Sequence, residues 1–354
     1  IYGRGEKDIR VNQRLEGLVQ RSVERTGEKA VIIIDEYDAP LLDVMNDKQK
    51  LVPMRQIMRN FYSPIKSLDP YLRFVFITGI NKFAQLSIFS ELNNLKDISM
   101  LPEFSAVCGI SQSELERVFP EQIEALAKAE GVSGERALEL LKENYDGYHF
   151  CVGSEDIYNP FSLLNAFSDR RFGKYWFETA TPTYLIERLE LKPIDERELD
   201  RMEYVSANEF NVSPEVTDNP LPLLYQTGYL TIKDYDKELD SYTLGYPNKE
   251  VRSGFLDSLL AGYNGSNPSG ASFVIRFNAA LRKGDIDEAL LRMQSFLSGM
   301  PNDLENKMEK HYQTIIYLIF SLLGYHIRTE EKSAVGRADA VCWTQDSIYV
   351  FEFK

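Results

Sequence analysis

Two acidic residues directly follow an apolar run near the start of the sequence. The run covers residues 30–34, and Asp35 and Glu36 come next. An unbroken run rich in β-branched residues is typical of a parallel strand buried on both faces. Nucleotides bind at the carboxyl ends of such strands, where an Asp can hold Mg²⁺ and a following Glu can polarise water. The pattern predicts a Walker B motif, and a strand that simply ends in an acidic turn is the alternative.

A second set of candidate catalytic residues lies near the C-terminal end. Asp339 lies on one expected strand, and Glu352 and Lys354 lie on the next, across a polar turn. Residues two apart share one face of a strand, so Asp339 can converge on Glu352 and Lys354 from its neighbour. Two carboxylates suit a divalent cation such as Mg²⁺, and a Lys can orient or help deprotonate water. The spacing predicts a metal-dependent phosphodiesterase site, although it also arises often by chance.

The elements expected around the first pair form a strand–helix–strand unit. An amphipathic helix is predicted over about 8–25, a second helix over about 48–66, and a second buried strand over 73–79. Strand, helix and strand at this spacing indicate a βαβ unit with a right-handed crossover. Such a unit places the ends of its two strands side by side.

The remaining chain reads as mostly helical until its last residues. We expect helices over 112–145, an aromatic-rich stretch at 145–185, a charged connection at 186–218 and a hairpin at 222–246. A Gly/Ser/Asn-rich break follows at 262–271. Helices over 272–298 and 303–323, the last capped by Gly324, precede three short strands. The aromatic stretch lacks interleaved basic residues, which favours core packing over base stacking.

Composition and charge narrow the function classes. The net charge of −14 argues against a broad nucleic-acid-binding surface, without excluding a local basic groove, and discourages binding to anionic membranes. No apolar stretch is long enough to predict a transmembrane helix. The three cysteines lack metal-site spacing, which indicates a reducing compartment and a cytoplasmic location.

The phosphate-binding loop that normally accompanies a Walker B strand is missing from the sequence. Its pattern is Gly-x-x-x-x-Gly-Lys-Ser/Thr. The one Gly-Lys pair, Gly173-Lys174, is followed by Tyr175. Either the loop precedes Ile1, or the predicted sheet does not bind nucleotide.

Several strings resemble a bacterial family of AAA-ATPase-like proteins fused to a PD-(D/E)XK nuclease-superfamily domain. They occur in the order of that family and span most of the chain, at residues 32–43 (IIIDEYDAPLLD), 74–82 (FVFITGINK), 87–99 (SIFSELNNLKDIS), 145–148 (YDGY), 158–164 (YNPFSLL), 175–182 (YWFETATP) and 224–233 (LYQTGYLTIK). In that family the Walker A loop precedes this region and the nuclease fold continues beyond the Lys strand. The resemblance therefore implies a chain truncated at both ends.

The resemblance implies an α/β fold in three parts. A partial P-loop-type parallel-sheet domain without Walker A is expected over residues 1–110. A mostly helical, mixed middle domain over 111–265 follows, and then a partial PD-(D/E)XK-like α/β domain over 266–354.

In the first part, the resemblance implies that Asp35 binds Mg²⁺ and Glu36 activates water. It also implies that Thr78 and Asn81, at the end of the second strand, contact the γ-phosphate of ATP. An ordinary strand end is the alternative for Thr78.

In the last part, the resemblance implies that Asp339 and Glu352 bind metal and that Lys354 acts beside them. It adds an acid on the preceding helix, Glu309, with Glu305 as the alternative. A first-turn acid exposed to water is the simpler interpretation of both. The Pro that usually precedes the Asp is replaced here by Ala338, a departure that puts only mild doubt on the site.

The function expected from these residues and from the resemblance is ATP-controlled, Mg²⁺-dependent cleavage of a phosphodiester, in a role such as defence against foreign nucleic acid. The expected cofactors are ATP and Mg²⁺, and the expected substrate is DNA or RNA. No membrane partner is expected, and a homo-oligomer remains open. The alternative is a non-catalytic nucleotide sensor or scaffold that uses the nuclease fold for binding.

Overall fold

The computed structural model describes most of the chain, as two compact units. The described residues are 5, 10–44, 47–80, 95–179, 199–214, 217, 219–263, 269–298, 308–333, 336–344 and 347–352. One unit comprises Ile1–Val107, Phe150–Ser154 and Glu203–Leu244, and the other comprises Cys108–His149, Glu155–Met202 and Gly245–Lys354. The expected division into three domains at residues 110 and 265 stays a prediction.

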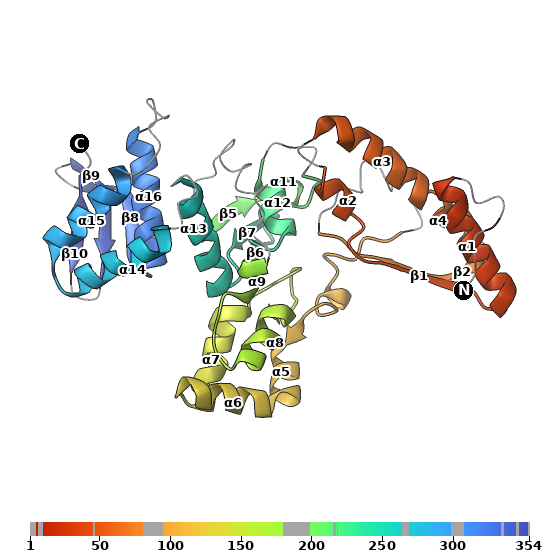
Figure 1. Cartoon of the computed structure of the whole chain (residues 1–354), viewed down its shortest axis with the longest axis horizontal. Helices are drawn as coiled ribbons and strands as arrows, with labels where there is room; N and C mark the ends of the chain where they lie inside the picture. The colour runs from red at the N-terminus through yellow and green to blue at the C-terminus, as the bar shows by residue number, and fades with distance from the viewer. Residues whose placement is uncertain are drawn as a thin grey trace. The chain divides into compact units, whose positions relative to one another are not determined.

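The first unit begins with the expected βαβ arrangement. Its elements are α1 (Val11–Thr26), β1 (Ala30–Ile34), α2 (Ala39–Leu42), α3 (Lys48–Tyr62), α4 (Pro64–Ser67), η1 (Asp69–Tyr71) and β2 (Leu72–Ile77). Strand β1 pairs with β2 in parallel, with Ile34 opposite Ile77. Gly27 ends α1 in the left-handed conformation (φ 72°), so the chain turns at once into β1. Figure 1 shows the two strands side by side; α1 contacts β1, and α3 and α4 contact α1.

One face of this strand pair forms the core and the other is exposed. Ile32 and Ile34 pack with helix residues into a buried cluster that includes Leu41 and Ile65. On the other face, Ile33 is 71% exposed. The predicted burial of β1 on both faces is therefore not met in the described part of the chain. An unbroken apolar run has no alternation, so it cannot reveal that only one face is covered.

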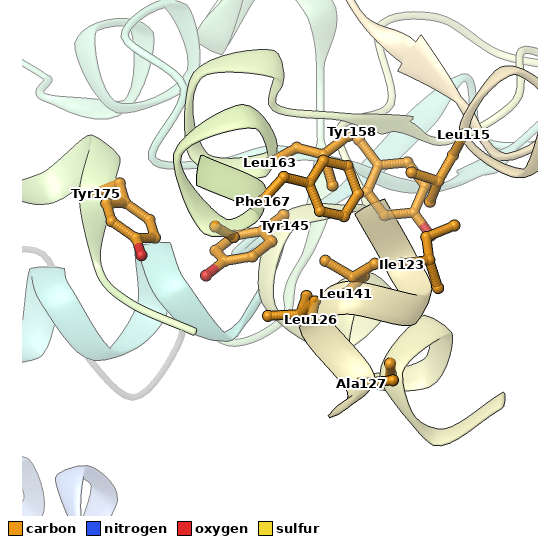
Figure 2. Packing of buried hydrophobic residues seen from close by; sticks show 12 residues of the cluster. Leu115, Ile123, Leu126, Ala127, Leu141, Tyr145, Tyr158, Leu163, Phe167 and Tyr175 are labelled. Carbon is orange, nitrogen blue, oxygen red and sulfur yellow. The ribbon is translucent and has the colours of Figure 1, made fainter. Parts of the chain in front are cut away.

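The second unit opens with a helical group around an aromatic core. Its elements are β3 (Ile110–Ser111), α5 (Gln112–Val118), α6 (Pro120–Glu130), α7 (Gly134–Tyr145), β4 (Ile157–Tyr158), α8 (Pro160–Asp169) and α9 (Tyr175–Thr179). Figure 2 shows Tyr145, Tyr158 and Phe167 gathered with Leu141 and Leu163 between these helices. Tyr145 and Tyr158 are fully buried, so the prediction of packing is confirmed for them.

The expected hairpin is also present. The region around it contains β5 (Met202–Val205), α11 (Ala207–Phe210), α12 (Leu221–Gln226), β6 (Thr231–Asp236) and β7 (Ser241–Gly245). A separate short helix, η3 (Pro102–Phe104), lies much earlier in the chain. The strand order is β5-β7-β6, so β6 and β7 are neighbours. The first residues of the expected hairpin form α12 instead.

The C-terminal part packs helices against a three-stranded sheet. It contains α13 (Lys249–Tyr263), α14 (Ser269–Arg282), α15 (Ile286–Ser298), α16 (Met308–Leu322), β8 (His326–Ser333), β9 (Gly336–Trp343) and β10 (Ile348–Phe351). The sheet order is β10-β9-β8, and both pairings are antiparallel. Gly324 ends α16 with φ 75°, as expected. Among the described helices, none is both long and apolar enough to cross a membrane.

Helix α16 is held on both sides. Phe320 of α16 meets Phe351 of β10, with ring centroids 5.2 Å apart. Towards α13, Arg252 donates two hydrogen bonds to the carboxylate of Asp200, at 2.5 and 3.0 Å, and a third to the carbonyl oxygen of Ser321. Tyr317 donates to the same carboxylate. These contacts position α16 against the sheet.

Candidate active sites

The first candidate site lies where β1 and β2 end. The parallel register brings Asp35 and Thr78 together, and the Thr78 hydroxyl donates a hydrogen bond to Asp35 Oδ1 at 2.5 Å. The backbone N–H of Thr78 donates to the carbonyl oxygen of Ile34 at 2.8 Å, which continues the ladder by one residue. The predicted convergence of Asp35 and Thr78 is therefore present.

Glu36 adopts an unusual backbone conformation. Its φ is 50°, in the left-handed region that costs a non-glycine residue about 1–2 kcal/mol. The bonds on either side fix it there. Its own N–H donates to Asp35 Oδ1 at 3.0 Å, and the N–H of Tyr37 donates to the carbonyl oxygen of Thr78 at 2.9 Å. Strained backbone held by its surroundings is common at functional sites, and the Glu36 side chain is exposed to solvent.

Asp38 is a buried acid that braces this edge, a role that sequence reasoning missed. Its side chain is fully buried, and Oδ1 accepts a hydrogen bond from the N–H of Ile80 at 3.0 Å. Burial, and then the negative charge of Asp38, raise the pKa of Tyr62. A Cβ on Gly79 would lie 2.3 Å from the Tyr37 ring and 2.6 Å from Asp38 Oδ1. The available signal was a third acid in the same short loop.

The oxygen atoms at this edge fit Mg²⁺ chemically. Both hydrogen bonds to Asp35 use Oδ1, and the residue is exposed. Mg²⁺ is usually bound by one or two carboxylates together with waters and substrate phosphates, so a full protein cage is not required. Within the described ranges, no three His, Cys, Asp or Glu side chains are grouped to hold a metal ion. Asn81, the other candidate, lies outside the described residues.

The second candidate site lies on the β9–β10 hairpin. Val350 is opposite Val341, and Phe351 is opposite Ala340. Continuing that register by one residue places Glu352 opposite Asp339. Because Phe351 packs on α16, alternation assigns Asp339 and Glu352 to the face that points away from the helix. Asp339 is half-buried and Glu352 is exposed.

The other residues of the predicted nuclease site are not described in the same detail. Glu309 lies in the first turn of α16, but its side chain lies outside the described part, as do Glu305 and Lys354 altogether. The register extended by one residue would set two of the predicted residues, Asp339 and Glu352, opposite each other. The roles of the other three stay predictions.

The residues of β9 that face α16 are apolar packing residues. Ala340 and Cys342 are fully buried there. Burial raises the pKa of the Cys342 thiol to about 12, so it stays protonated at neutral pH. Cys342 is a packing residue, and alternation assigns the predicted site residues Asp339 and Glu352 to the other face of the sheet.

Comparisons with known proteins match a segment near each end of the chain to a protein family. Residues 2–89 match the model of a predicted AAA-ATPase family, and residues 307–354 match that of a PD-(D/E)XK nuclease superfamily. An uncharacterized protein in the vnfD 5′ region of Azotobacter chroococcum mcd 1 is 32% identical over 349 residues, which cover 95% of this chain. The chain spans 64% of that relative's length. No solved structure matches the chain. The chain thus joins a segment similar to predicted AAA-ATPases to one similar to the PD-(D/E)XK nuclease superfamily, as the resemblance in its sequence implied.

Proposed function

We propose that this protein is an ATP-regulated, Mg²⁺-dependent nuclease that cleaves nucleic-acid phosphodiesters. The observation that supports the proposal is the β9–β10 register, whose last pair is Phe351 and Ala340; one further residue along each strand would put Glu352 opposite Asp339. Like charges directly opposite each other destabilise a sheet. A divalent cation between the two carboxylates would remove that repulsion, and both carboxylates supply the oxygen ligands that Mg²⁺ prefers.

The proposed chemistry uses four residues of this chain. Asp339 and Glu352 would hold the cation, which supplies charge stabilisation at the scissile phosphate. Lys354 would donate hydrogen bonds from its ammonium group and so orient the attacking water. Glu309, in the first turn of α16, is the further acid that the resemblance adds to this set.

ATP would act at the other end of the chain. Asp35, oriented by Thr78, would hold the Mg²⁺ of the nucleotide, and Glu36 would position the water that attacks the γ-phosphate. Asn81 would contact the same phosphate. The match of residues 2–89 to predicted AAA-ATPases supports this assignment. Nucleotide hydrolysis would then control cleavage, and defence against foreign nucleic acid is one role for such control.

The test is cleavage of DNA and RNA by the whole protein in Mg²⁺, with and without ATP. Glu352→Ala and Lys354→Ala should each lower the cleavage rate by at least about a hundredfold, because each removes a group acting at the reacting phosphate. Glu238→Gln, an exposed acid in the β6–β7 turn, is the matched control and should cleave normally. Unchanged cleavage rates in Glu352→Ala and Lys354→Ala would contradict the assignment of the site. Binding of nucleic acid without any cleavage would favour the scaffold alternative.

A further inference from the structure

The parallel pairing of β1 with β2 becomes irregular just past the ends of the two strands. The N–H of Thr78 donates to the carbonyl oxygen of Ile34, as a regular ladder requires. In such a ladder the residue two positions after Ile34, which is Glu36, would donate its N–H back to the carbonyl oxygen of Thr78. That oxygen accepts instead from the N–H of Tyr37, one residue further along the chain. One extra residue is therefore inserted after β1, as in a β-bulge.

The bulge changes the face on which Glu36 lies. Side chains alternate between the two faces of a strand, and Ile32 and Ile34 pack into the core. Without the extra residue, Glu36 would continue the row of Ile32 and Ile34 and point towards the core. In the structure Glu36 is exposed, as its neighbour Asp35 is, so the alternation is broken at this point. The bulge therefore keeps the Glu36 side chain in solvent.

Asp38 supplies a hydrogen-bond acceptor that the bulge removes from the ladder. In a regular ladder the N–H of Ile80 would donate to the carbonyl oxygen of Glu36. That carbonyl oxygen is used in a turn, where it accepts from the N–H of Ala39 at 3.0 Å. The N–H of Ile80 donates instead to Asp38 Oδ1, also at 3.0 Å, and Asp38 is fully buried. A buried carboxylate thus takes the place of a main-chain carbonyl just beyond the bulge.

We propose that Asp38 is a positioning residue for ATP hydrolysis: its carboxylate keeps the end of β1 in the bulged form, and the bulged form directs Glu36 towards the attacking water. The inference rests on the proposed function and adds a residue to that site. Because Asp38 is buried, it acts through Glu36 and not on the nucleotide itself.

The bulged form depends on Asp38 because it carries a cost of its own. Glu36 lies in the left-handed region, with φ 50°. The hydrogen bonds on either side of the bulge offset that cost, and one of them is the bond from Ile80 to Asp38. When an apolar side chain replaces the carboxylate, the N–H of Ile80 loses its acceptor in the bulged form only. The balance then moves away from this form, and Glu36 is no longer held in one orientation.

The test compares Asp38→Leu with Asp38→Asn in the whole protein. Leu keeps the branched shape of the side chain but has no acceptor, whereas the Asn oxygen can still accept the N–H of Ile80. We expect Asp38→Leu to lower kcat for ATP hydrolysis by about a hundredfold and to change KM for ATP by less than about threefold, because Glu36 is misplaced. Asp38→Asn should stay within about tenfold of the parent. An unchanged kcat in Asp38→Leu, or a rise in KM alone, would overturn the inference.

Ile65→Ala controls for a simple loss of stability. Ile65 is fully buried in the core cluster that packs against β1. Removal of its side chain should make the protein easier to unfold by urea and leave kcat for ATP hydrolysis unchanged. If Ile65→Ala lowers kcat as much as Asp38→Leu does, the effect of Asp38 is one of stability alone and the inference fails.

Amide hydrogen exchange tests the bulge without any need for ATP hydrolysis. In Asp38→Leu the N–H groups of Tyr37 and Ile80 should exchange at least about tenfold faster than in the parent, and in Asp38→Asn they should stay protected. Unchanged exchange in Asp38→Leu would overturn the inference while leaving the proposed function intact. Faster exchange in a protein whose parent does not hydrolyse ATP would support the link between Asp38 and the bulge and contradict the proposed function.

Discussion

The two candidate sites are built by different means. At the β1–β2 edge, Asp35 is fixed by a hydrogen bond from Thr78, and the loop behind it is braced by the buried carboxylate of Asp38. At the β9–β10 hairpin, the proposed pairing of Asp339 with Glu352 depends on the strand register, extended by one residue beyond the Phe351–Ala340 pair. The first geometry depends on hydrogen bonds between residues distant in sequence, and the second depends on the register in which two neighbouring strands pair. The β1–β2 site should therefore tolerate insertions nearby and lose activity when one of its hydrogen bonds is removed. The β9–β10 site should lose activity when the register of its strands shifts.

A one-residue insertion tests the register and should have the largest effect. A Gly between Phe351 and Glu352 keeps the contact of Phe351 with Phe320 but moves Glu352 to the face towards α16. Nuclease activity should fall by at least about a hundredfold, with ATP hydrolysis unchanged. A Gly inserted after Glu238, in the β6–β7 turn, is the control. Full cleavage by the first insertion variant would show that register does not build the site.

Gly79→Ala tests the tertiary contacts of the other edge. The added methyl group would lie 2.3 Å from the Tyr37 ring, and relieving that clash should cost about 2–3 kcal/mol of unfolding free energy. Urea unfolding and ATP binding measure the result. Gly134→Ala is the control, because its Cβ meets open space at the start of α7. Equal stability of both variants would contradict the close packing of this edge.

Removal of the Asp38 carboxylate should have a smaller effect. In Asp38→Ala the N–H of Ile80 loses its acceptor, which should lower the unfolding free energy by about 2 kcal/mol. The pKa of Tyr62 should fall towards its ordinary value but stay above it, because burial is the larger cause of its rise. Absorbance titration of the tyrosines measures that shift. A Tyr62 pKa that does not move would show that Asp38 carries no charge in the folded protein.

The same titration has a consequence for stability against pH. Tyr62 has a raised pKa in the folded state, so the native protein holds its proton more tightly than the unfolded chain does. The stability due to this group is complete below pH 10 and falls as the pH rises above that value. Asp38→Ala should reduce this fall, which thermal unfolding between neutral and alkaline pH will measure. A steeper fall in the variant would contradict the sign.

Thr78→Val should give the smallest change. The substitution keeps the shape of the side chain and removes the hydrogen bond to Asp35. ATP hydrolysis should fall by less than about tenfold, as expected for one hydrogen bond, and nuclease activity without ATP should not change. Thr344→Val, in the β9–β10 turn, controls for loss of a threonine hydroxyl. A loss as large as that of Asp35→Ala would mean that Thr78 acts on the nucleotide itself.

The sequence allowed the two pairs of candidate acids to be located, but it did not reveal the neighbouring residues that position them. Asp35 and Glu352 follow apolar strands, and strand ends and period-two alternation can be read locally. Asp38 could not be assigned because its acceptor role depends on Ile80, which is brought near only by the parallel pairing of β1 and β2.

The extent of β8 was also underestimated. Three short strands were expected after α16, whereas β8 is eight residues long and spans His326–Ser333. Its polar second half lacks the alternating apolar pattern from which strands are recognised, and its pairing with β9 cannot be read from the local sequence. The cation–π pair of Arg328 with Trp343 was missed because it depends on the register between β8 and β9, which neither strand shows by itself.

The left-handed backbone of Glu36 has a consequence for which residues the position can accept. Selection for heat resistance alone would favour Gly or Asn there, since both enter this conformation more easily. Glu36→Gly should therefore unfold at the same or a higher temperature than the parent while losing ATP hydrolysis. At position 36, thermal stability and activity would then favour different residues. A screen for thermostable variants should therefore select substitutions at this position that abolish ATP hydrolysis.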